Sequence, residues 1–249
     1  MQSQGNKYIK ERRRKKRIKN CMGLFTLFIG LFILFLLKSP TFNISEIVIN
    51  NNSTIITEDL IKEKTEIFMG KNIFWIKRKD VQAVFEREPY IKEVVVSKKL
   101  PNKLTIEVVE NKPVFMMESE GKVFVLDKYG KILDKKAGDV DFAVVRLEGI
   151  NIKNREINSY ITDDEKTKEI IGSFGELLAV NTSEIQFNVL DLKDSKDIKI
   201  YSGDVLVKIG SEYSLMTKLD KAIDILKNLK MAKGYIDVRF DSNPIIGEN

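Results

Sequence analysis

The sequence has no histidine and a single cysteine, Cys21. Without histidine, a Ser-His-Asp triad, a Cys-His dyad and a histidine metal site cannot be built, and one cysteine cannot close an internal disulfide. The 14 glycines include no Gly-rich phosphate-binding loop, which argues against a nucleotide-dependent enzyme. We therefore expect no catalytic residue, no cofactor, no metal ion and no small-molecule substrate, and we favour a role in binding other proteins.

The excess of positive over negative charge comes from the start of the chain. Residues 1–20 carry nine basic side chains and one acid, a net charge of +8, whereas the whole chain carries +6. The remaining 229 residues therefore sum to −2 and offer no net positive field, so nucleic acid is not an expected partner. With 43% hydrophobic and 31% charged residues in a chain of 249, the composition is that of a globular protein with one large or two small domains.

An uncharged apolar run follows the basic residues. Residues 21–37 contain no charge and are Phe- and Leu-rich on every side, so a helix there would span about 26 Å and have no polar face. A cleavable signal peptide is disfavoured because no small-x-small site follows the run. The charge asymmetry predicts a basic cytoplasmic tail (residues 1–20), a transmembrane helix (residues 21–37) and an extracytoplasmic remainder, that is, a single-pass type II protein of the cell membrane.

Residues 41–112 show the pattern of a small β-α-α-β-β module. A β-branched run at residues 44–49 predicts a strand, and Thr57 is a good N-cap for a helix that reaches Gly70. A second helix is expected from about Lys79 to Glu88, where Pro89 ends it. Residues 91–97 and 104–109 alternate as strands around a turn at residues 100–102.

Three runs in this module carry a resemblance. They are Pro-x-Ile-x-x-Val at residues 89–94, Leu-Pro-Asn-x-Leu-x-Ile at residues 100–106 and Glu-Asn-Lys-Pro-Val at residues 110–114. In this order and behind one basic-flanked span, they resemble the end of the POTRA domain in the bacterial FtsQ/DivIB cell-division family. Asn111 departs from that pattern, in which arginine is more common.

The remaining residues, 113–249, are expected to form an extracytoplasmic β domain with amphipathic helices, so the fold class is α+β. A capping box at residues 162–165 would open one helix, and apolar spacing predicts another over residues 215–229. Strands are expected at residues 122–126, 131–133, 144–147, 185–189, 198–200, 205–209 and 235–240.

The resemblance implies a scaffold of the division machinery. Its partners would be small bitopic coiled-coil proteins of the DivIC/FtsB and FtsL types, and through them it would help control septal peptidoglycan synthesis. The strand at residues 235–240 has two equally good interpretations. It is either an edge strand open to pairing with a partner strand, or an edge at which the charges of Asp237 and Arg239 prevent such pairing. The resemblance favours docking there, and the positions that match the family's docking motif are Arg239, Phe240 and Ser242. The strand itself adds Tyr235, Ile236 and Val238 to the expected partner-binding residues.

Two other functional classes compete with a scaffold. A membrane-anchored cell-wall enzyme would need a nucleophile with a base, and no Ser-x-x-Lys opens a convincing helix. A POTRA-bearing translocation protein would need a membrane β-barrel, for which residues after 113 offer too few strands.

Three smaller features have a plain structural interpretation. The carboxylates at residues 163–165 suit a helix N-terminus better than a metal site, and Asp191, Asp194 and Asp197 suit a solvated loop better than a calcium loop. Trp75 is expected to pack between the two helices of the first module, rather than to serve as an exposed anchor for a partner or the membrane surface.

Overall fold

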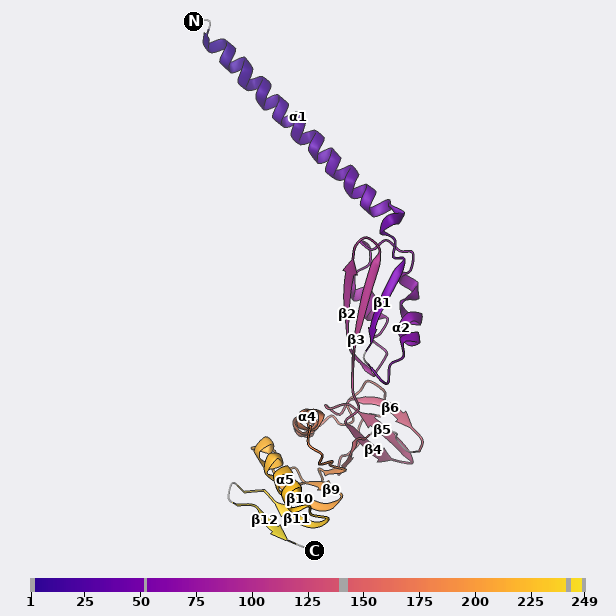
Figure 1. The fold of residues 1–249 in the computed structure, drawn as a ribbon, viewed down its shortest axis with the longest axis vertical. Helices are drawn as coiled ribbons and strands as arrows, with labels where there is room; N and C mark the ends of the chain where they lie inside the picture. Colours follow the sequence, from indigo (N-terminus) through magenta and orange to yellow (C-terminus); the bar gives the residue numbers. More distant parts are fainter. Residues whose placement is uncertain (1–2, 52, 139–142, 241–242, 248–249) are drawn as a thin grey trace. The chain divides into compact units, whose positions relative to one another are not determined.

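The computed structural model describes residues 3–51, 53–138, 143–240 and 243–247 (Figure 1). The chain divides into two compact units. The N-terminal unit comprises Met1–Glu86 and Glu93–Val109, and the C-terminal unit comprises Arg87–Lys92 and Glu110–Asn249.

The N-terminal unit begins with one long helix, α1 (Ser3–Lys38). Its segment Arg14–Lys38 contains an 18-residue stretch with a mean hydropathy of 2.4, none of which is buried. The segment is therefore long and apolar enough to cross a membrane, the one such helix in the described part of the chain. The predicted span, residues 21–37, lies within it. A helix with apolar side chains all round and no protein to cover them is stable only in a lipid environment.

The predicted β-α-α-β-β module follows α1, preceded by the short 3-10 helix η1 (Pro40–Phe42). Strands β1 (Glu46–Asn51), β3 (Lys103–Glu110) and β2 (Ile91–Lys99) form a sheet in that order, with β1 parallel to β3. Helix α2 (Glu58–Thr65) begins at the predicted cap, since the Thr57 hydroxyl accepts a hydrogen bond from the Leu60 N–H at 3.3 Å. It runs into the 3-10 helix η2 (Glu66–Phe68). Helix α3 (Arg78–Ala83) ends earlier than the predicted Glu88, and residues 84–87 form turns instead of helix.

The C-terminal unit contains one mixed sheet, which has nine strands among the described residues, in the order β12-β11-β10-β9-β8-β7-β4-β5-β6. Helices α4 (Glu165–Ala179) and α5 (Leu215–Leu229) bury their apolar stripes in the same core as the inward-facing residues of these strands. The strands are β4 (Phe115–Ser119), β5 (Lys122–Leu126), β6 (Ile132–Lys136), β7 (Val145–Glu148), β8 (Val189–Asp191), β9 (Ile198–Ser202), β10 (Asp204–Gly210), β11 (Lys233–Asp237) and β12 (Ile245–Gly247).

Several local details of this unit differ from the sequence-based prediction. The N-cap of α4 is Asp164 rather than Thr162, and its carboxylate accepts from the Thr167 N–H at 2.8 Å. The strand predicted over residues 185–189 begins only at Val189. The Asn181 side chain closes a turn there by donating to the Ile185 carbonyl at 3.0 Å, which keeps residues 181–185 out of the sheet. Strands β4 and β12 were not predicted.

Candidate partner-binding surface

The strand predicted to carry the partner site is not an open edge. Strand β11 runs parallel to β10, with Tyr235 opposite Leu206, and antiparallel to β12, with Ile236 opposite Ile246. Its backbone is therefore paired on both sides, and the expectation of a free edge at residues 235–240 is wrong. The covering strand β12 has only three residues, which is too short for an alternating pattern to reveal.

The edge of the sheet at this end is β12. Within the described residues it has a neighbouring strand on one side only, so its other side presents backbone N–H and C=O groups that a further strand could pair with. Ile245 and Ile246 are 55% and 44% exposed. Because successive side chains of a strand point to opposite faces, the edge offers an apolar side chain on each face of the sheet.

The predicted site residues divide into two groups. Ile236 and Val238 lie in the core, at 0% and 1% exposure, and the Val238 N–H donates to the Lys208 carbonyl at 3.0 Å. Tyr235, Arg239 and Phe240 are the ones whose side chains reach solvent, and Ser242 lies outside the described residues. Arg239, Phe240 and the β12 edge are thus the exposed parts of this region, whereas Ile236 and Val238 pack in the core.

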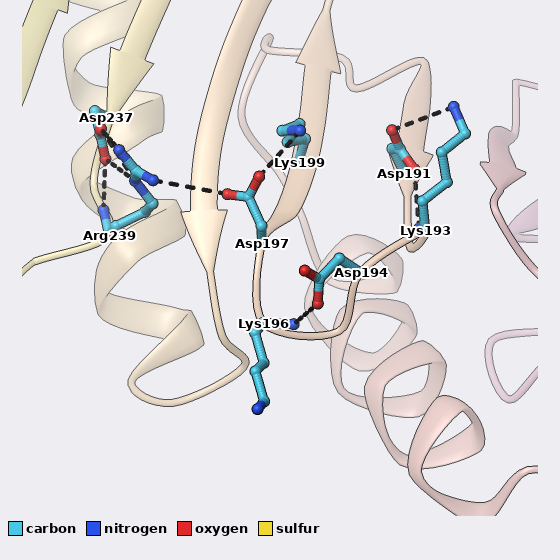
Figure 2. A network of polar contacts seen from close by, with 8 residues as sticks. All are labelled: Asp191, Lys193, Asp194, Lys196, Asp197, Lys199, Asp237 and Arg239. Carbon is cyan, nitrogen blue, oxygen red and sulfur yellow. Dashed lines mark hydrogen bonds and ion pairs between the residues drawn. The ribbon is translucent and has the colours of Figure 1, made fainter.

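A charged pair fixes the end of β11 (Figure 2). Arg239 donates from Nη2 to Asp237 Oδ2 at 2.6 Å and from Nε to Oδ1 at 3.0 Å, and its backbone N–H donates to Oδ1 at 3.1 Å. The guanidinium also lies 3.8 Å from Asp197 and 5.5 Å from the centroid of the Phe240 ring. The hydrogen bonds from Arg239 lower the pKa of Asp237, although burial opposes them, and the same bonds raise the pKa of Arg239.

The Asp237–Arg239 pair makes the stability of the folded chain depend on pH in a defined direction. A carboxyl whose pKa is lowered by folding contributes stability above its ordinary pKa of 3.8, and this contribution is lost as the pH falls through the folded-state value. We expect Asp237→Asn to unfold at lower urea concentration than the wild type at pH 7, and by a smaller margin at about pH 3, below the ordinary pKa of the carboxyl. Urea unfolding of the full chain in non-ionic detergent measures this. A gap of equal size at both pH values would contradict it.

The acidic residues of the β8–β9 loop hold the loop in shape (Figure 2). Asp191 and Asp194 accept from the backbone N–H groups of Lys193 and Lys196 at 3.0 and 2.8 Å. Asp197 lies 3.0 Å from the Lys199 ammonium group. The three carboxylates do not converge, and the described residues contain no cluster of three or more His, Cys, Asp or Glu that could hold a metal ion.

Trp75 does not have the packed position expected for it. Its side chain is 64% exposed, whereas its neighbours Ile73 and Ile76 are buried at 0% and 6%. The two isoleucines occupy the core positions of this segment, and Trp75 is left on the surface. Spacing alone did not show which members of the apolar run Ile73–Ile76 would face inward.

Comparison with known proteins places these features in a class. Residues 42–111 match the POTRA domain, FtsQ-type, so the chain is a POTRA protein with one candidate membrane helix ahead of that domain. A protein named cell division protein DivIB from Clostridium botulinum strain Hall is 38% identical over 244 residues, covering 96% of this chain and 95% of the relative.

Two further relatives carry the same name. DivIB of Clostridium acetobutylicum is 31% identical over 242 residues, covering 96% of both chains. DivIB of Bacillus subtilis is 22% identical over 227 residues, covering 90% of this chain and 82% of the relative. The chain therefore belongs to the DivIB/FtsQ family of cell-division proteins.

Proposed function

We propose that this protein is a scaffold of the division machinery that binds small bitopic coiled-coil proteins of the DivIC/FtsB and FtsL types. Through them it would help control septal peptidoglycan synthesis, without catalysis of its own. The family supports a role in division. The observation that carries the binding proposal is the β12 edge, which has a neighbouring strand on one side only among the described residues and exposes Ile245 and Ile246. Phe240, three residues after the end of β11, is also exposed.

The mode of binding follows from this geometry. An extended partner segment would add a strand to β12, so main-chain hydrogen bonds would supply affinity, and Ile245 and Ile246 would contact it from the two faces. Phe240, three residues after the end of β11, would supply an aromatic anchor, and Tyr235 and Arg239 would be further exposed contacts. Ile236 and Val238 would hold the strand in place from the core side.

Affinity purification of the full chain from detergent-solubilised membranes tests the partner class. The expected result is enrichment of small single-pass proteins with coiled-coil segments, relative to a matched purification of a chain carrying Ile246→Pro. Proline removes a backbone donor and disrupts pairing at an edge, and Ile246 is half-exposed, so the core is left intact. Equal recovery of the same proteins with both chains would contradict docking at β12.

The proposed orientation places the N-terminus in the cytoplasm and both folded units outside it. It rests on the nine basic side chains of residues 1–20, which favour retention on the cytoplasmic side. A reporter that is active only outside the cytoplasm, fused after Asn249, should be active, and a reporter that needs the cytoplasm should be silent at the same position. The opposite pattern would overturn the orientation.

A further inference from the structure

An apolar surface loop lies next to the predicted end of the membrane span. Residues 69–75, here called the Phe-Trp loop, expose Met69, Phe74 and Trp75, and Trp75 is 64% exposed. Hydrogen bonds from backbone N–H groups fix the conformation that exposes the two rings. The Phe74 N–H donates to Asn72 Oδ1 at 3.0 Å and the Trp75 N–H donates to the Asn72 carbonyl at 3.1 Å. The turn at Asn72 therefore holds two adjacent aromatic rings away from the core.

Hydrogen bonds connect this loop to the end of α1. The Asn72 side chain donates to the carbonyls of Leu36 and Leu37, at 3.0 and 3.3 Å. The Ile73 N–H donates to the Phe42 carbonyl at 2.8 Å, and the Phe42 and Phe74 ring centroids are 5.2 Å apart. The loop is thus bonded directly to the residues at which the apolar span ends.

The charge around the loop matches an anionic membrane surface. Residues 69–79 carry four basic side chains, Lys71, Lys77, Arg78 and Lys79, and no acid. Arg78 also lies close enough to Lys98 to lower its pKa, together with the larger effect of burial. Aromatic side chains flanked by lysine and arginine are typical of the layer between lipid headgroups and acyl chains.

The β2–β3 turn lies at the same end of the N-terminal unit as the Phe-Trp loop and exposes a further apolar side chain there. The Asn102 side chain donates to Ser45 Oγ at 2.8 Å, and the Ser45 N–H donates to the Asn102 carbonyl at 3.1 Å. Leu100, in this turn, is exposed and is preceded by Lys98 and Lys99.

We propose that the Phe-Trp loop docks into the headgroup layer of the membrane that α1 spans, with Phe74 and Trp75 as interfacial anchors and Lys77 and Arg78 facing anionic lipid. This rests on α1 being inserted as a membrane span. Two attachments, one spanning and one interfacial, would restrict rotation of the module about the span. The occupant is lipid rather than protein because the loop is bonded to the carbonyls of the span itself.

Trp75 is the only tryptophan of the chain, so its fluorescence reports on this loop alone. The full chain is reconstituted at low density into phosphatidylcholine vesicles containing phosphatidylglycerol. The expected result is blue-shifted emission that brominated lipids quench and acrylamide does not reach. The matched control is the double variant Trp75→Phe with Thr54→Trp. It moves the only tryptophan to an exposed position beyond the far end of β1, about 20 Å along the strand, and should show the opposite behaviour.

The possible outcomes distinguish failure of the loop to dock from failure of α1 to insert into the membrane. Flotation of the vesicles tests insertion of α1, and a chain that does not float contradicts the span. A chain that floats but whose Trp75 is quenched by acrylamide as strongly as the control overturns the docking of the loop. A blue shift without quenching by brominated lipid indicates a protein contact and also overturns it. Lys77→Glu with Arg78→Glu should weaken lipid quenching in vesicles with phosphatidylglycerol, and an unchanged signal would contradict the role of charge.

Discussion

Gly175→Ala should lower the free energy of unfolding by about 2–3 kcal/mol, although alanine forms helices more readily than glycine. Gly175 lies inside α4, where an added Cβ would be 2.0 Å from the Lys128 carbonyl oxygen. That atom belongs to the backbone between β5 and β6, so it cannot move aside as a flexible side chain would. Thermal unfolding of the full chain in detergent, followed by circular dichroism, measures the change.

Gly172 is the matched control on the same helix. An added Cβ there would meet the Tyr129 ring at 3.4 Å, an ordinary contact. Gly172→Ala is therefore expected to leave stability unchanged or to raise it by up to about 1 kcal/mol through helix propensity. Equal melting temperatures for the two variants would show that α4 does not press against residues 127–131 as described.

Phe240→Ala should weaken binding of the division partner by about 2 kcal/mol, or roughly 30-fold, with little change in melting temperature. Binding is expected to change without a change in stability because the Phe240 ring is 63% exposed, so its truncation creates no cavity. Val238→Pro should do the reverse and destabilise the fold, since the Val238 N–H donates to Lys208 within the sheet.

Tyr160→Ala is the control for the loss of an exposed aromatic side chain. Tyr160 forms a β-bridge with Lys131, next to β6 at the other end of the sheet, and is 44% exposed. It should bind the partner like the wild type. If Phe240→Ala binds as tightly as Tyr160→Ala while both remain folded, Phe240 is not an anchor.

The N-terminal module is the part of the fold that the sequence predicts best. Its helix cap at Thr57 and its β2–β3 turn are local signals, and each works through the chemistry of one or two residues. The apolar span is a compositional signal of the same kind. These features do not depend on contacts between distant residues, so the sequence alone predicts them. Pro89 marked the end of the second helix only approximately, because α3 already ends at Ala83.

The proposed partner site was harder to predict from the sequence, because it depends on pairing between strands that are distant in the chain. The residues of β11 alternate clearly, but nothing local shows that Ile245 and Ile246 return to cover them. The prediction therefore included Ile236 and Val238, which are buried, and missed the two isoleucines of the edge. An apolar pair directly after Asn243 and Pro244 was the available signal. Strand β4 was missed for a related reason, since its Met116, Met117 and Glu118 have little intrinsic preference for strands.

Photo-crosslinking in dividing cells tests the central proposal most directly. A photoreactive residue at position 246, on the β12 edge, is compared with one at position 135, on β6 at the opposite edge of the sheet. Docking at β12 predicts that position 246 crosslinks a small single-pass division protein, identified by mass spectrometry, and that position 135 does not. Crosslinking of that protein from position 135 and not from position 246 would contradict the proposed site.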